Sequence, residues 1–108
     1  MRSFSLQTLK ILSVFVEDPS KEWYGTELMD ATVLSSGTLY PILEGLLQRG
    51  WIEDEWEDID AKVEGRRPRR YYRITMLGKK EAVRVLNAEI QPIVKRLGWL
   101  TIGVRANG

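Results

Sequence analysis

The sequence predicts a mostly helical α+β domain with a two-stranded wing and a long C-terminal helix, on three observations. A stripe of apolar residues at helical spacing runs up to Gly50, which ends that helix. Two strand-like runs follow at once, separated by a charged loop. Apolar residues then recur in alternating steps of three and four over residues 83–97. This order is typical of a winged helix-turn-helix, which places one helix in a DNA groove and a wing beside it.

A first helix is expected from Ser5 to Glu17. Asp18-Pro19-Ser20 ends it, because a proline ring cannot continue a helix and restricts the residue before it. The inward positions of this helix are predicted to be Leu9, Leu12, Phe15 and Val16.

A short second helix is expected directly after Trp23-Tyr24-Gly25. Thr26 is its candidate N-cap, because a threonine hydroxyl can accept a hydrogen bond from a free backbone N–H. Its apolar anchors are Leu28 and Met29, and Thr32-Val33-Leu34 forms the turn that follows.

The third helix is expected from Ser36 to Arg49, with Ser35 or Ser36 as its cap. Pro41 lies near its first turns, where it removes one backbone donor and bends the helix slightly. The apolar stripe that faces the core consists of Leu39, Ile42, Leu43, Leu46 and Leu47.

The hairpin is expected to run out over Trp51–Glu57 and to return over Arg69–Ile74, with residues 58–68 as its loop. On the return strand, Tyr71 or Tyr72 is expected to pack in the core. The loop ends in Arg66, Arg67, Pro68, Arg69 and Arg70, which predict a compact cationic tip.

The last helix is expected from Met76 to about Leu97, with Thr75 as its cap. Pro92 predicts a kink or a break in it. Its apolar series predicts a dimerisation seam formed by Val83, Leu86, Ile90, Ile93 and Leu97. The chain therefore divides into a winged helix-turn-helix DNA-binding domain over 1–75, a dimerisation helix over 76–98 and a tail over 99–108.

Composition excludes several classes of function. The 108 residues include no cysteine and no histidine, which leaves no thiolate or imidazole ligand for zinc and no serine–histidine triad. No glycine-rich phosphate loop or carboxylate pair stands out, so neither an enzyme nor a cofactor is expected. The chain shows no membrane-spanning run and no secretion signal, which predicts a cytoplasmic protein.

The net charge of +1 conceals a strong asymmetry along the chain. Residues 51–64 carry seven acidic groups and one basic group, whereas residues 65–108 carry eleven basic groups and two acidic ones. A local basic cluster of this kind, rather than the overall charge, is what indicates a nucleic-acid partner.

The outer side of the third helix is a candidate DNA-reading surface. Ser36, Gly37, Thr38, Tyr40, Pro41 and Glu44 remain outside when the apolar stripe faces the core. Hydroxyl groups can bind phosphates or base edges, and a helix N-terminus favours a phosphate. The alternative is that these residues only cap the helix and form a solvated surface.

The four wing arginines are candidate phosphate ligands, because guanidinium groups match phosphate oxygens and can enter a narrow minor groove. The alternative is a solvated charge run that neutralises the acidic stretch from Glu53 to Asp60.

Several motifs together resemble the PadR family of transcriptional regulators. The resemblance covers residues 5 to about 97. Its motifs are Tyr24-Gly25, Gly37-Thr38-Leu39-Tyr40-Pro41 with Leu43 and Leu46-Leu47, Gly50-Trp51-Ile52, the run from Arg67 to Thr75, and Gly78. A single helix after the wing resembles the compact branch of that family, which has no separate ligand domain.

The resemblance implies a homodimeric repressor that binds double-stranded DNA at a two-fold operator. The wing arginines would contact the DNA backbone. The other DNA-binding residues would be Tyr24, Ser35, Ser36, Gly37, Thr38, Tyr40 and Pro41. The resemblance also suggests a small aromatic effector bound between subunits, where Trp23, Trp51, Trp56 and Trp99 are candidate lining residues. Tryptophans in a small domain are more often part of the core.

A second function is a winged-helix adaptor that binds another protein and has no DNA role. The acidic run before the wing or the seam of the last helix would provide its docking surface. The two functions differ at the wing, because an adaptor does not need four clustered arginines.

Overall fold

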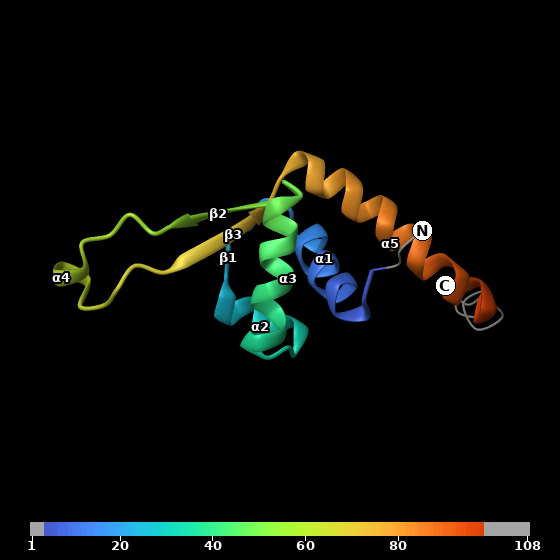
Figure 1. The fold of residues 1–108 in the computed structure, drawn as a ribbon, viewed down its shortest axis with the longest axis horizontal. Helices are drawn as coiled ribbons and strands as arrows, with labels where there is room; N and C mark the ends of the chain where they lie inside the picture. The colour runs from blue at the N-terminus through green and yellow to red at the C-terminus, as the bar shows by residue number, and fades with distance from the viewer. Residues whose placement is uncertain (1–3, 99–108) are drawn as a thin grey trace, which may run out of the picture.

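The computed structural model describes residues 4–98. Its elements follow the order α1 (Leu6–Glu17), β1 (Trp23–Tyr24), α2 (Gly25–Thr32), α3 (Ser36–Gln48), β2 (Ile52–Trp56), α4 (Ala61–Glu64), β3 (Arg70–Ile74) and α5 (Met76–Arg96). The predicted fold class is confirmed: a mostly helical domain with a small antiparallel sheet, a wing and a long last helix. Figure 1 shows the wing and α5 extending in opposite directions from the body formed by the other helices.

The helix α1 supplies one side of the core. Ser5 is its N-cap and its hydroxyl accepts a hydrogen bond from the backbone N–H of Thr8 at 3.1 Å. Leu9, Leu12 and Phe15 are buried as predicted, and Val16 packs at the edge of the core. Ile11, which was not predicted to face inward, is also fully buried.

The start of α2 differs from the prediction that Thr26 caps it. Tyr24 occupies the N-cap position, and its backbone N–H donates to the carboxylate of Glu27 at 2.9 Å. Thr26 lies inside the helix and is exposed. The helix ends at Val33 in a left-handed conformation, within the predicted turn.

Ser35 is the N-cap residue of α3. Leu39, Leu43 and Leu46 are buried, with Ile42 and Leu47 packed against the same cluster. Pro41 lies inside the helix and has no N–H, so the carbonyl of Gly37 has no donor at the usual helical position. Gly50 follows the helix with a φ of +75°, which glycine adopts without steric cost.

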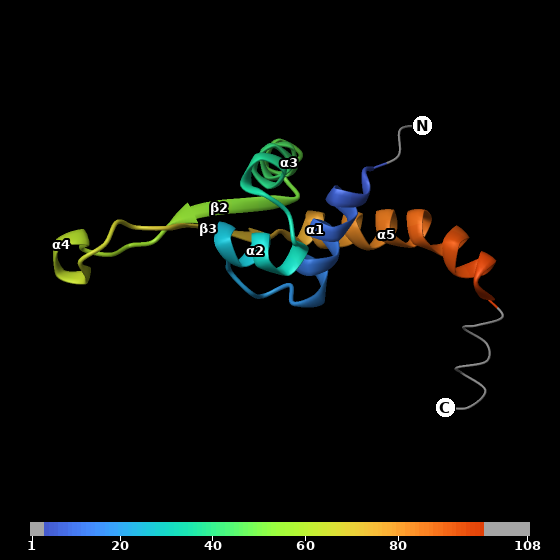
Figure 2. The same ribbon diagram turned by 90° about the horizontal axis from the view of Figure 1, so that it is seen from below.

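The sheet has three strands in the order β1–β3–β2, all antiparallel. The sequence predicted the hairpin of β2 and β3 and missed β1, which pairs Trp23 with Tyr72 and Tyr24 with Tyr71. The addition of β1 joins the start of α2 to the base of the wing. Figure 2 shows the wing extending past α2 and α3 to α4 at its tip.

The tip of the wing differs from the predicted arginine cluster. The tip is the short helix α4, which Asp60 caps and Gly65 ends at a φ of +71°. The four arginines follow α4 on the returning arm, and Arg70 opens β3. The prediction that they form the tip itself is therefore wrong.

The helix α5 begins where predicted. The hydroxyl of Thr75 accepts from the backbone N–H of Gly78 at 2.9 Å. A Cβ on Gly78 would collide with the carbonyl of Trp51, so glycine allows α5 to start against the residue that leads into β2. The helix continues through Pro92 to Arg96, so the break considered for this position does not occur.

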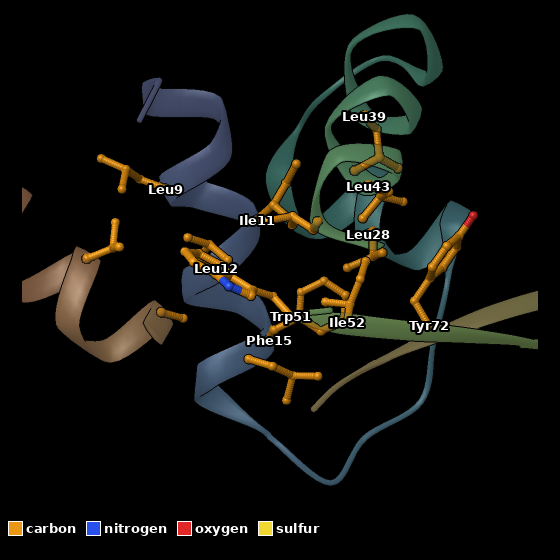
Figure 3. Close-up of a cluster of buried hydrophobic side chains, with 14 residues drawn as sticks. Leu9, Ile11, Leu12, Phe15, Leu28, Leu39, Leu43, Trp51, Ile52 and Tyr72 are labelled. Carbon is orange, nitrogen blue, oxygen red and sulfur yellow. The ribbon is translucent and has the colours of Figure 1, made fainter. Parts of the chain in front are cut away.

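The core lies between α1, α2, α3, the sheet and the first half of α5 (Figure 3). Trp51 and Ile52 bring the start of β2 into it, and Ala82 and Val85 bring α5. Tyr72 is buried, as expected for one of the two tyrosines, and Figure 3 shows its hydroxyl directed away from the other core side chains. This core fixes α3 and the base of the wing relative to each other.

Candidate nucleic-acid interface

The N-terminal part of α3 presents a polar surface to solvent. Ser35, Ser36, Gly37 and Pro41 are exposed, and Thr38 is half-buried. This end of α3 therefore offers hydroxyl groups on a surface that the buried stripe holds in place.

Tyr40 lies on α2 rather than projecting freely. A Cβ built on Gly25 would collide with the hydroxyl end of the Tyr40 ring, so glycine at this position makes room for the ring. Tyr40 is nevertheless 38% exposed. It therefore joins α3 to the first residue of α2 and keeps one edge open to a partner.

A pocket of about 360 Å³ opens beside Tyr40, between the start of α2, α3 and the wing. Its walls are largely aromatic, and two arginines of the wing lie at it. The side chain of Trp56 on β2 is mostly exposed here, and the hydroxyl of Tyr72 is buried without a hydrogen-bond partner. The lining residues are Tyr24, Gly25, Thr26, Tyr40, Trp56, Arg69, Arg70 and Tyr72.

Arg70 connects the wing to α3. Its guanidinium donates to the carboxylate of Asp54 at 2.6 Å and to that of Glu44 at 3.3 Å. It also lies over the ring of Tyr72, at 5.1 Å from the centroid. Burial is the largest single influence and lowers the pKa of Arg70, but the hydrogen bond with Asp54 and the charges nearby together raise that pKa above its ordinary value. This arginine is engaged within the protein.

Arg66 is engaged as well. Its guanidinium donates two hydrogen bonds to the carboxylate of Glu57, at 2.6 and 3.1 Å. These bonds raise the pKa of Arg66 above its ordinary value. For Arg66 and Arg70, the alternative that wing arginines neutralise the acidic stretch therefore describes the contacts observed.

Arg67 and Arg69 differ from their two neighbours. Within residues 4–98, neither has a carboxylate within ion-pair distance. Both are exposed, and the guanidinium of Arg69 lies 5.5 Å from the centroid of the Tyr24 ring. Of the four wing arginines, these two thus have no ion-pair partner among the described residues, and Arg69 lines the aromatic pocket.

The opposite side of the hairpin is acidic. The guanidinium of Arg73 lies 2.7 Å from Glu53, 3.1 Å from Glu22 and 3.6 Å from Glu55. Three exposed carboxylates thus surround one arginine. By the strand register, this side is the one turned away from Asp54 and Arg70. A nucleic acid would be repelled here and attracted on the side of α3.

The three tryptophans within residues 4–98 lie in different parts of the subunit. Trp51 is in the core and Trp56 is at the wing pocket, while Trp23 is half-buried beside Lys21. Trp99 lies outside the described residues. Thr26 was not predicted at the site, and Trp56 was predicted only as a candidate lining residue of an effector pocket. The alternation along β2, which places Trp56 on the same side as Ile52 and Asp54, was the available signal for Trp56.

Within residues 4–98, no group of three or more carboxylates is placed to hold a metal ion. None of the helices described is long and apolar enough to cross a membrane.

Comparison with known proteins gives one family. The transcriptional regulator PadR-like family matches residues 11–84. No curated protein matches the chain. The structure is similar to the circadian clock associated protein Pex from Anabaena, with 25% identity, a TM-score of 0.59, and 88% of this chain and 86% of that one covered.

Two further solved structures share the fold. One is a PadR family transcription regulator from Clostridium difficile, with 22% identity and a TM-score of 0.68 over 90% of this chain and 99% of that one. The other is NadR in complex with 4-hydroxyphenylacetate, with 17% identity and a TM-score of 0.60 over 96% of this chain and 70% of that one.

Proposed function

Because the chain belongs to the PadR-like family of transcriptional regulators, we propose that it is a repressor that acts as a homodimer on a two-fold operator. Membership of the family makes it a DNA-binding transcriptional regulator. The proposal adds that the protein represses transcription, that two subunits act together, and which residues bind DNA. It also makes the protein a non-enzymatic regulator that works where the DNA is, in the cytoplasm.

One observation supports the proposed DNA-binding surface. Tyr40 of α3 and Arg69, one of the two wing arginines without an ion-pair partner within residues 4–98, line the same aromatic pocket. In the proposed complex α3 enters the major groove, where Thr38 and Tyr40 contact base edges. Gly37 faces open space, since nothing lies within 4 Å of the place where its Cβ would be, and its lack of a side chain lets DNA come close to the backbone there.

The remaining DNA-binding residues are proposed to position the duplex. Arg67 and Arg69 bind backbone phosphates beside the bases that α3 reads. Ser35, Ser36, Pro41 and Tyr24 surround the end of α3 and offer hydroxyl groups or packing to the adjoining backbone. Arg66 and Arg70 act mainly by holding the wing against the body, as their contacts with Glu57, Asp54 and Glu44 support.

The second half of α5 supports the proposed dimer. The buried residues of α5, Gly78, Ala82 and Val85, all lie in its first half. Beyond them the helix leaves the body with apolar side chains in solvent. Four residues of the predicted seam, Val83, Ile90, Ile93 and Leu97, are between 37% and 55% exposed, and Leu86 is half-buried. A second copy of this helix would cover the stripe and give the two-fold symmetry of the operator.

The proposal also includes a small aromatic effector that binds the protein. The NadR neighbour is described as a complex with 4-hydroxyphenylacetate. In this chain the aromatic pocket beside Tyr40 has suitable walls and lies within one subunit, at the surface proposed to bind DNA. An occupant would therefore compete directly with DNA. Titrating 4-hydroxyphenylacetate into the operator complex should release DNA, and no release at saturating ligand would contradict this part for that ligand.

The function is tested by selecting duplexes from a random library with the full chain. We expect an enriched inverted repeat, because two α3 helices related by a two-fold axis read two half-sites about one helical turn apart. Thr38→Ala should weaken binding to the selected repeat by about 1–3 kcal/mol and leave random DNA unchanged. Gln48→Ala, at the far end of the same helix, is the control. No enrichment at low salt would overturn the proposal and favour the adaptor function.

A further inference from the structure

Glu57 lies at the point where the outgoing arm of the wing leaves β2, and several donors converge on it. Its carboxylate accepts from the hydroxyl of Tyr24 at 2.8 Å and from the guanidinium of Arg66 at 2.6 and 3.1 Å. It also accepts from the backbone N–H of Arg69 at 2.8 Å. The backbone N–H of Glu57 in turn donates to the carbonyl of Arg69 at 2.9 Å. The side chain is only 12% exposed.

These donors come from different parts of the chain. Tyr24 belongs to β1 and is the N-cap residue of α2, whereas Arg66 and Arg69 belong to the returning arm of the wing. Glu57 itself belongs to the outgoing arm. One carboxylate therefore ties both arms of the wing to the start of α2.

Both ends of Arg69 depend on this arrangement. Its backbone N–H is bound to Glu57, and its guanidinium lies over the ring of Tyr24, whose hydroxyl is bound to the same carboxylate. Arg69 is one of the two wing arginines without a carboxylate partner within the described part of the chain. The direction in which it projects is set by groups that Glu57 holds.

We infer that Glu57 is a positioning residue for DNA binding, which holds Tyr24 and Arg69 in the orientation that the operator requires. The inference rests on the proposed function and gives a role to a residue that touches no DNA in it. The positioning effect of Glu57 should strengthen DNA binding, whereas its negative charge should weaken DNA binding. A carboxylate beside DNA repels the phosphates, so removing the charge alone should tighten binding. Losing the contacts that position Arg69 should weaken DNA binding.

Two substitutions separate these effects. Glu57→Gln removes the charge and the ion pair with Arg66. Glu55→Gln is the matched control, because Glu55 lies two residues away on β2, is exposed, and is bonded to Tyr71 rather than to the residues at Glu57. We expect Glu55→Gln to bind the operator as tightly as the native protein or more tightly. Glu57→Gln should bind it about tenfold more weakly, the effect of losing one charge-assisted hydrogen bond.

A mutant cycle tests whether Glu57 acts through Arg69. In the background of Arg69→Ala, the tenfold loss caused by Glu57→Gln should largely disappear. In the background of Arg67→Ala, whose arginine makes no contact with Glu57, the loss should persist. A loss of equal size in both backgrounds, or tighter operator binding by Glu57→Gln, would overturn the inference.

Amide hydrogen exchange provides a readout that needs no DNA. The backbone N–H of Arg69 should exchange faster in Glu57→Gln than in Glu55→Gln, while amides of the core helix α1 stay equally protected in both. Unchanged exchange at Arg69 would contradict the inference. If the native protein bound no duplex, the proposed function and the DNA-binding role of Glu57 would both fail, and this measurement would still show whether Glu57 holds the backbone of Arg69. If Glu57→Gln did not fold, Tyr24→Phe, which removes one donor to Glu57, should give the same changes at smaller size.

Discussion

The hydroxyl end of Tyr40 occupies the space that a Cβ on Gly25 would need. The contact joins the helix proposed to read DNA to the first residue of α2. It also explains why glycine follows Tyr24 directly, in a helix where alanine would otherwise be favoured. The position of Tyr40, and with it the open edge of its ring, is therefore set by a residue on another helix.

Gly25→Ala should displace the Tyr40 ring while leaving the fold intact. The colliding atoms belong to the far end of a side chain, which can rotate, and alanine suits a helix better than glycine does. We expect operator affinity to fall by about 1–3 kcal/mol, as for the loss of one specific base contact. Binding isotherms on operator and random DNA, with circular dichroism for folding, measure this. Loss of helicity, or native affinity for the operator, would contradict the prediction.

The apolar seam of α5 predicts a homodimer, and introducing one charged residue into the seam should dissociate it. Ile90→Asp would bury an uncompensated carboxylate between two helices, at a cost of about 3 kcal/mol or on the order of a hundredfold in the dissociation constant. Asn87→Asp, an exposed position in the same turn, is the control and should remain dimeric. Sedimentation equilibrium at micromolar concentration distinguishes the two. A monomeric native chain, with or without operator, would show that α5 is not a dimerisation helix.

The lowered pKa of the Glu57 carboxylate predicts how the unfolding free energy of the protein depends on pH. Hydrogen bonds from Arg66 and then Tyr24 lower its pKa from 4.5 to about 2. A carboxylate whose pKa is depressed on folding stabilises the protein above its unfolded value, and that stabilisation is lost as the pH falls through the folded value. The difference in unfolding free energy between the native protein and Glu57→Gln should thus be constant above about pH 4.5 and shrink toward about pH 2.

Urea unfolding of both proteins at several pH values measures this difference, with Glu55→Gln as the control for general effects of acid. A difference that stayed constant down to about pH 2.5 would mean that the contacts of Glu57 do not stabilise the fold. The same contacts raise the pKa of Tyr24, through its hydrogen bond with Glu57 first of all. The tyrosine therefore remains a hydrogen-bond donor throughout the range of this experiment.

Local pattern predicted the helices well. Thr75 before an apolar series was enough to place the start of α5, and the stripe from Leu39 to Leu47 placed α3. The cap of α2 was missed, because β1 has only two residues and the position of Tyr24 depends on pairing with Tyr71, far along the chain. The helix α4 was also missed, although Asp60 and Gly65 are ordinary residues for its two ends.

For the DNA-binding site, a different feature could not be predicted from the sequence. The run of four arginines predicted a basic wing, but composition does not reveal which guanidinium groups are already paired. Arg70 is paired with Glu44 and Asp54, and Arg66 with Glu57, across turns and between elements. Those pairings depend on the register of the hairpin and the placement of α3, which only the folded chain defines. The distinction between paired and unpaired arginines is therefore a result of the structure.

The salt dependence of operator binding tests the central claim, that α3 and the unpaired wing arginines bind DNA together. Each phosphate contact releases a counterion, so the slope of log affinity against log salt should flatten by about 0.9 for each arginine lost. For Arg67→Ala/Arg69→Ala we expect a slope flatter by about two units and weaker binding to every duplex. Lys95→Ala/Arg96→Ala, at the end of α5, removes the same charge and should leave the slope unchanged. An unchanged slope in the wing variant, or equal flattening in both, would contradict the claim.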